Sequence, residues 1–224
     1  FVYADEFYRL EGADGRTLVF HADINKLEKE LLQFSPADKE PISDFIQGIR
    51  ICLRFDFPSD RDPFLTRIRK QAGTFFTFMK YGGEFKKWSN VTGEQFASRF
   101  KDPLLQQAFR EIWIPEFSLV FLFFTFAYLH QRNAGYPIGG SMPMSEALDA
   151  RYRALGGEIN YNKKVARILT ADGRATGIRL VDGTEVYADR VISAADGHAT
   201  LYDMLDGKYL DPATREPYEK WPIF

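Results

Sequence analysis

Few residues in this chain have types and spacings that could do chemistry, and the clearest pair is Asp196 and His198. They follow a short apolar run, Val191 to Ser193, and polar residues directly after a strand often face a ligand. A carboxylate beside an imidazole can hold or move a proton. The same pair occurs more often as a turn residue and a helix cap, which is the interpretation we favour. The spacing therefore predicts no catalytic residue, and the catalytic residues stay unknown.

The remaining reactive side chains are scattered. The chain has 3 His and 1 Cys, and neither His21 nor His130 has cysteines beside it, so no metal site is expected. The single cysteine, Cys52, excludes an internal disulfide and favours a reducing compartment such as the cytoplasm. We expect its thiol to be buried and inert. No G-x-S-x-G nucleophile elbow is present in the sequence.

Composition and charge narrow the class of protein. The chain has 224 residues, of which 45% are hydrophobic and 27% charged, and this is typical of a globular protein with a real core. A net charge of −2 argues against nucleic acid as a partner. The 21 Phe are numerous and require an apolar environment, either a core or an apolar binding site.

The elements that must position Asp196 begin at the glycine-rich turn Gly139-Gly140-Ser141. Pro143 is tolerated in the first turn of a helix, and Gly156-Gly157 is a C-terminal stop. Between them one helix face carries apolar residues at helical spacing: Met144, Leu148, Tyr152 and Leu155.

Strands are predicted after this helix. Ile159 and Tyr161 alternate as a short strand, and Asp172-Gly173 and Asp182-Gly183 are strong hairpin signals between β-favouring runs. The range 163–188 is therefore predicted to be a three-stranded antiparallel meander. Val191 to Ser193 is predicted to be a last apolar strand.

These segments resemble a known family. GYPIGGSMPMSEAL, LGGEINYNKKVARI, GIRLVDGTEVYADRVISAAD and HATLYDML are similar to the phytoene desaturase and retinol saturase group of FAD-dependent oxidoreductases, as is the Tyr8–Leu31 stretch. The resemblance implies an α/β (α+β) fold. Residues 135–224 would form part of a Rossmann-like FAD/NAD(P)-binding domain with its β-meander. Residues 1–134 would form a mostly helical substrate (cap) domain.

The resemblance also implies a cofactor site for FAD. A valine at the head of the meander meets the adenosine end of FAD through its backbone, and Val165 matches it. Small residues after the last strand and the glycine-rich turn also match cofactor-side segments: Ala194, Ala195, Asp196, Gly139, Gly140 and Ser141. No G-x-G-x-x-G follows a strand in this sequence. We therefore expect an internal portion of a longer enzyme that does not by itself retain FAD.

The residue pattern of 1–134 mainly predicts a hairpin and helices that pack against one another. Phe7 to Phe20 predicts a hairpin, Asp23 an N-cap, and Thr92 with Gln95 a capping box.

Two segments of this part allow other interpretations. Pro63 to Trp88 combines an apolar stripe (Leu65, Ile68, Ala72, Phe75 and Met79) with cations and aromatic residues, which is typical of an interfacial helix at a membrane and of a solvated amphipathic helix. Ser118 to Leu129 is too short to span a bilayer. Because it is apolar all round, we expect burial on every side, as a core helix or the wall of an apolar cavity.

Three functions remain open. The first is part of an FAD-dependent desaturase, saturase or isomerase that acts on an apolar isoprenoid or carotenoid-like substrate, in the cytoplasm and with peripheral membrane contact through Pro63–Trp88. The second is a non-catalytic lipid- or membrane-binding module. The third is an amine-oxidase-like flavoenzyme with a small polar substrate. The apolar run Ser118–Leu129 favours the first over the third.

Overall fold

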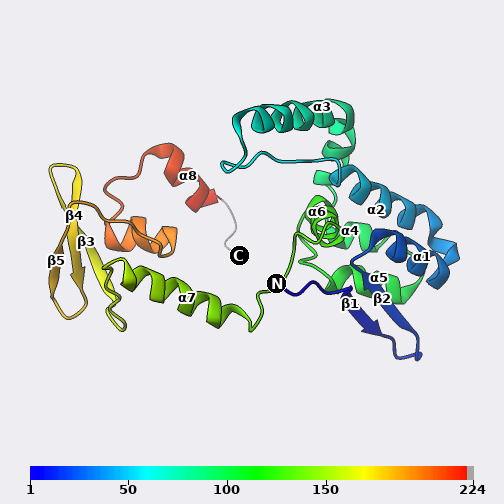
Figure 1. The fold of residues 1–224 in the computed structure, drawn as a ribbon, viewed down its shortest axis with the longest axis horizontal. Coiled ribbons are helices and arrows are strands. Elements are labelled where there is room, and N and C mark those ends of the chain that lie inside the picture. Colours follow the sequence, from blue (N-terminus) through cyan, green and yellow to red (C-terminus); the bar gives the residue numbers. More distant parts are fainter. Residues whose placement is uncertain (221–224) are drawn as a thin grey trace. The chain divides into compact units, whose positions relative to one another are not determined.

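The computed structural model describes residues 1–220, which form two compact units (Figure 1). The first unit is Phe1–Ser145 and the second begins at Glu146. Helices and small antiparallel sheets are mixed along the chain, which confirms the α/β class at this coarse level. The sequence places a domain boundary earlier, between 134 and 135, and that boundary stays a prediction.

The first unit opens with a β-hairpin and continues in helices. Strand β1 (Glu6–Glu11) pairs antiparallel with β2 (Thr17–His21), as predicted, and the turn between them contains Gly15 at φ 81°. The following elements are α1 (Ile24–Phe34), η1 (Pro36–Asp38), α2 (Lys39–Cys52), α3 (Phe64–Ser89), α4 (Gly93–Ala97), α5 (Pro103–Glu111) and α6 (Leu119–His130).

The predicted helix starts are confirmed by their capping hydrogen bonds. Asp23 accepts hydrogen bonds from the backbone N–H groups at the start of α1. At α4, the hydroxyl of Thr92 accepts from the N–H of Gln95, and the Gln95 side chain accepts from the N–H of Thr92. Such caps satisfy donors that the first helical turn leaves free.

Several phenylalanines of the first unit gather in one core around Phe45 of α2. Its ring lies 4.9 Å from that of Phe109, 5.7 Å from that of Phe123 and 5.6 Å from that of Phe126, measured between centroids. The pairs with Phe109 and Phe126 are edge-to-face, an arrangement that is favourable beyond the apolar area that it buries. The core therefore holds α2, α5 and α6 together and accommodates much of the aromatic content.

The second unit contains the predicted meander. Helix α7 (Ser141–Ala154) leads into it, and β3 (Val165–Ala171), β4 (Arg174–Leu180) and β5 (Glu185–Tyr187) form an antiparallel sheet in sequence order. Asp172 and Gly173 both have positive φ, 50° and 74°, as a tight hairpin turn requires. The π-helix η2 (Ala199–Met204) and α8 (Pro212–Lys220) complete the described part.

Two predicted strands of this unit are wrong. Ile159 and Tyr161 lie in irregular chain, and Val191 to Ser193 also forms no strand. A strand needs a neighbour for its backbone hydrogen bonds, and within residues 1–220 no segment pairs with either run. Ile192 is accordingly 92% exposed.

The helix before the meander ends as predicted, but its apolar face has no packing partner within residues 1–220. Gly156 has φ 88° and its successor, Gly157, donates its N–H to the carbonyl of Tyr152, 3.1 Å away. The side chains of the apolar face are all exposed: Met144, Leu148, Tyr152 and Leu155.

Candidate functional site

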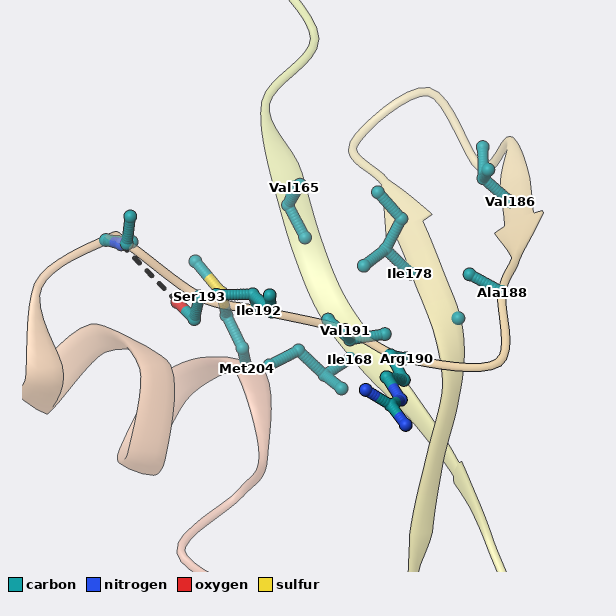
Figure 2. Close-up of a pocket in the computed structure, with 13 residues that line it drawn as sticks. Val165, Ile168, Ile178, Val186, Ala188, Arg190, Val191, Ile192, Ser193 and Met204 are labelled. Carbon is teal, nitrogen blue, oxygen red and sulfur yellow. Dashed lines mark hydrogen bonds between the residues drawn. The ribbon is translucent and has the colours of Figure 1, made fainter. Parts of the chain in front are cut away.

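An apolar pocket of about 370 Å³ lies in the second unit, between the meander and the segment that follows it (Figure 2). This volume is at the lower end of the range for small-molecule sites. The lining residues come from β3, β4, β5, η2 and residues 188–195. The pocket thus brings together residues that the sequence analysis considered separately.

One wall of the pocket is a row of β-branched side chains across the meander. Ile168 of β3 pairs with Ile178 of β4, which in turn pairs with Val186 of β5, and all three line the pocket. Gly177 lies beside them, where a Cβ atom would collide with the carbonyl oxygen of Val186. The close approach of β4 and β5 therefore requires glycine at this position.

The opposite wall consists of the extended segment with small side chains. Ala188, Ala194 and Ala195 line it, and small side chains allow a ligand to approach the backbone closely. The hydroxyls of Ser193 and Thr200 lie 2.8 Å apart, which ties the segment to η2. The N–H of Ala195 donates to the Ser193 hydroxyl at 3.4 Å, the bond drawn in Figure 2.

Three of the predicted cofactor-binding residues lie at this pocket. Val165, at the start of β3, lines it together with Ala194 and Ala195. Gly139, Gly140 and Ser141 are not among its lining residues. Both glycines have φ near +85°, and Ser141 begins α7, so this turn has a local structural role. Their contact with a cofactor stays a prediction.

Asp196 and His198 behave as a cap and a packing residue. The carboxylate of Asp196 accepts the N–H of Ala199 at 2.8 Å and so caps the turn before η2. The His198 ring stacks on Tyr202 at 4.5 Å between centroids. The favoured turn-and-cap interpretation is confirmed, and the cofactor contact of Asp196 stays a prediction.

Sequence reasoning missed several lining residues, of which Arg190 and Met204 are the most distinctive. Among the described lining residues Arg190 is the one with a charge, and Figure 2 shows its guanidinium at the pocket. The alternation of Ile168 and Ile178 across a hairpin could have indicated an apolar sheet face. Both residues lie in segments that resemble the family, but their residue types and spacing do not single them out as lining residues.

In the first unit, α6 is buried on one face only. Phe123 and Phe126 are 2% and 0% exposed, whereas Phe121 is 57% exposed. The expected burial on every side is therefore wrong. The core of this unit covers one face of α6, and nothing in the described chain covers Phe121 fully.

Helix α3 also carries an uncovered apolar stripe. Leu65, Phe75 and Met79 are 78%, 60% and 69% exposed, while Trp88 near the end of the helix is buried in the core. Within residues 1–220, no helix is long and apolar enough to cross a membrane. The stripe is thus an exposed face of a helix that is fixed mainly at its C-terminal half.

Reactive groups elsewhere are consistent with a structural role. Burial raises the pKa of the Cys52 thiol to about 12, so this thiol stays protonated, as expected. Among the described residues, no group of three or more His, Cys, Asp or Glu side chains could hold a metal ion.

Comparisons with known proteins agree with the resemblance seen in the sequence. Residues 84–222 match the family model described as "Flavin containing amine oxidoreductase". The chain is 29% identical over 209 residues to the phytoene desaturase (neurosporene-forming) of Rhodobacter capsulatus, covering 90% of this chain and 38% of that protein. It is 29% identical over 199 residues to the phytoene desaturase (lycopene-forming) of Pseudescherichia vulneris, covering 85% of this chain and 39% of that protein.

A further relative is named for a different activity. The chloroplastic prolycopene isomerase of Arabidopsis thaliana is 34% identical over 91 residues, which cover 41% of this chain and 15% of that protein. The chain thus spans about two fifths of the length of the desaturases, 38% and 39%. The predicted resemblance to phytoene desaturases is confirmed, and the chain belongs to the flavin containing amine oxidoreductase family, among its phytoene desaturase-like members.

Proposed function

We propose that this chain is part of an FAD-dependent oxidoreductase that acts on carbon–carbon bonds of an apolar isoprenoid. The observation that carries the proposal is the alignment with phytoene desaturases over 90% and 85% of the chain, which includes both units. A small polar amine needs no apolar run of the length of Ser118–Leu129. The exposed aromatic residues of the first unit agree with an apolar substrate.

The pocket of the second unit fits one end of FAD. Its volume, about 370 Å³, and its small side chains suit an adenosine-sized group that approaches the backbone at Val165 and Ala194. A bound flavin would accept the electrons removed from the substrate. In this proposal residues 135–224 belong to a Rossmann-like cofactor domain and residues 1–134 to a substrate domain.

Anaerobic mixing of the full-length protein with phytoene tests the activity. A desaturase is expected to bleach the oxidised flavin absorbance as the polyene gains a double bond, which product analysis would detect. An amine of similar concentration is the control and should leave the flavin oxidised. Flavin reduction by the amine and not by phytoene would contradict the proposal.

Isomerisation is a second candidate, and the identity with the prolycopene isomerase of Arabidopsis thaliana favours it. An isomerase would change the geometry of a polyene with no net change in its number of double bonds. Incubation with a cis-configured polyene, followed by separation of products, distinguishes the two reactions. New double bonds indicate desaturation, and a cis-to-trans change at constant composition indicates isomerisation.

We also propose that α3 brings the enzyme to a membrane surface. Its exposed apolar stripe lies on the same helix as Arg67 and Arg69, and each cation near an anionic bilayer contributes about 1 kcal/mol. Lys70 is different, because its ammonium pairs with Asp56 at 3.0 Å and Asp62 at 3.3 Å. A change of Lys70 to Glu would therefore also break these ion pairs, so Lys70 is unsuitable for this test.

Liposome co-sedimentation of the full-length protein tests the membrane contact. The double change Arg67→Glu and Arg69→Glu should weaken sedimentation with anionic vesicles, most clearly at low salt. The exposed pair Arg151→Glu and Arg174→Glu makes the same change in net charge in the second unit and is the control. Equal sedimentation of both variants would contradict membrane contact and would mean that α3 is a solvated amphipathic helix.

A further inference from the structure

Helix α3 carries two adjacent glycines, Gly82 and Gly83, in its interior (Figure 1). After proline, glycine is the least favourable residue inside a helix. Some helical glycines are required by a close contact, as Gly48 of α2 is by the ring of Phe123. At Gly82 and Gly83 an added Cβ atom would meet nothing within 4 Å in the described chain, and neither residue has a positive φ. Neither packing nor backbone conformation within residues 1–220 therefore requires this glycine pair.

The glycine pair divides α3 into two parts with opposite surroundings. We call residues 64–81 the arm and residues 84–89 the stem. In the stem, Trp88 is 4% exposed and Phe85 packs against the core. In the arm, the apolar stripe is uncovered, and Phe75, for example, is 60% exposed. The glycine pair thus lies where the fixed end of the helix meets its exposed end.

The polar contacts of the arm connect it to the segment that precedes it. Lys70 pairs with Asp56 at 3.0 Å and with Asp62 at 3.3 Å, and the hydroxyl of Thr74 donates to the backbone carbonyl of Asp56 at 3.2 Å. Among the described residues, the side-chain ion pairs and hydrogen bonds that leave the arm all end on residues 56–62. This segment forms no helix or strand, so it can follow a movement of the arm.

The ring contacts of the arm with the rest of the unit lie close to the glycine pair. Phe78 precedes Gly82 by about one helical turn, and its ring lies 4.8 Å from that of Phe55 and 5.5 Å from that of Phe85, measured between centroids. The guanidinium of Arg54 lies 5.6 Å from the ring centroid of Tyr81. Contacts beside a pivot move little when the far end of the helix swings, so they permit a change of angle.

We infer that α3 bends at Gly82 and Gly83, and that the arm thereby lays its apolar stripe on a membrane surface. Glycine pairs are common positions of helix bends, and hinges are a few residues that absorb a change in backbone angles. An interfacial helix lies in the plane of the membrane, whereas the buried Trp88 fixes the direction of the stem. A rigid α3 could meet the membrane only at the angle that the stem dictates. The membrane part of this inference rests on the membrane contact proposed above.

The test measures the distance between a spin label on the arm and one on α1 in the full-length protein. The labels are genetically encoded residues at two exposed positions, Gln71 in the arm and Lys29 in α1. Gln71 is about 16 Å along the helix from Gly82, so a bend of about 20° moves it by about 6 Å. Vesicles of phosphatidylcholine and phosphatidylglycerol should therefore shift the distance between the labels by several ångström in the wild type.

Alanine variants separate a bend from a general gain in helix stability. The double change Gly82→Ala and Gly83→Ala should narrow the distribution of label distances in solution and reduce the shift with vesicles about twofold or more. Gly73→Ala is the control, because it adds a methyl group in open space within the arm. It should keep the distribution and the shift of the wild type. Alanine favours the helix at all three positions, so no variant should melt below the wild type.

The outcomes distinguish the bend from the membrane contact. If the wild type sediments with the vesicles but its label distance does not shift, or shifts equally in the double-alanine variant, the bend is wrong and the membrane contact stands. If the wild type does not sediment, the membrane contact is wrong, and the distribution of label distances in solution decides on the bend. A narrower distribution in the double-alanine variant than in Gly73→Ala supports the bend, and equal widths overturn it.

Discussion

At the scale of single residues, two carboxylates connect the loops of the first unit. Asp38 is 1% exposed and accepts hydrogen bonds from the hydroxyl of Ser35 at 2.7 Å and the N–H of Lys101 at 2.6 Å. It also accepts the N–H of Asp102 at 3.0 Å, and Asp102 in turn pairs with Arg16 at 2.6 Å. A buried carboxylate is tolerated when several donors satisfy it. Asp38 thus links the end of α1 to the start of α5.

Replacing Asp38 by alanine should destabilise the protein strongly. The change leaves buried donors without partners, each of which costs about 1–3 kcal/mol, so a loss of about 3 kcal/mol is expected. Urea denaturation measures it. The control is Glu40→Ala, since that carboxylate is 89% exposed and its pair with Arg99 is long, at 3.9 Å. A loss for Asp38→Ala no greater than for Glu40→Ala would contradict this role.

The lowered pKa of Asp102 predicts how the stability of the fold depends on pH in acid. Burial alone would raise the pKa of its carboxyl, but hydrogen bonds from Arg16, Leu104 and Leu105 hold that pKa below its ordinary value. A group with a lowered folded pKa stabilises the protein above its unfolded pKa, about 3.9, and loses this contribution as pH falls through the folded pKa. Asp102→Asn and Arg16→Gln should therefore weaken the fall in melting temperature below about pH 4. If both variants lost melting temperature below pH ~4 as steeply as the wild type, this role of Asp102 would be contradicted.

At the scale of elements, the packing of α2 on α6 depends on a glycine. A Cβ atom on Gly48 would overlap the ring of Phe123, which is 2% exposed and enclosed by the core. Glycine in a helix normally costs about 1 kcal/mol relative to alanine. Here close approach of the helices outweighs that cost, because the ring of Phe123 occupies the space that a side chain would need.

Gly48→Ala tests this balance. Overpacking costs about 1–3 kcal/mol and exceeds the gain in helix propensity, so a net loss of about 1 kcal/mol is expected in chemical denaturation. Gly73→Ala in α3 is the matched control, because its added Cβ would meet nothing within 4 Å. That variant should gain up to about 1 kcal/mol. The same sign of change in both variants would show that the contact with Phe123 does not decide the outcome.

Truncating a phenylalanine should cost much more stability on the buried face of α6 than on its exposed face. Phe126 is 0% exposed, and removing a buried phenylalanine costs about 3–5 kcal/mol. Phe121 is 57% exposed, so Phe121→Ala should change stability by less than about 1 kcal/mol. Melting temperature and flavin content of the full-length variants would measure this. Similar losses at both positions would mean that α6 is buried on both faces in the complete protein.

At the scale of the whole molecule, the described residues form a buried aromatic core in one unit and a pocket in the other. The pocket offers small side chains and backbone, but the sequence has no G-x-G-x-x-G turn for a pyrophosphate. Such a turn places backbone N–H groups and a helix N-terminus against the phosphates. Adenosine contacts alone would leave most of the charge of FAD without partners.

We therefore predict that this chain, purified by itself, does not hold FAD tightly, whereas the full-length protein is yellow. Absorbance between 350 and 500 nm, about the range of oxidised flavin, after gel filtration would measure the bound cofactor. Circular dichroism of the same purified chain, which shows whether it is folded, controls for misfolding. Stoichiometric flavin in the folded chain would contradict the prediction.

The sequence by itself determined the local structure of this protein. Caps such as Asp23 and Thr92 and turns such as Asp172-Gly173 act over a few residues, so their residue types alone are sufficient to predict them. The family resemblance and the position of Val165 at the head of the meander also came from the sequence.

Burial and pairing were decided only by the tertiary structure. Periodicity shows that α3 and α6 have apolar faces, but which face is covered depends on elements far away in the chain, as Phe121 and Leu65 show. Val191 to Ser193 has the composition of a strand and forms none, because a strand needs the backbone of a neighbour. Arg190 and Met204 likewise line the pocket only because the chain returns across the meander after β5. Contacts between distant residues are a property of the folded chain, and no local pattern of residues contains them.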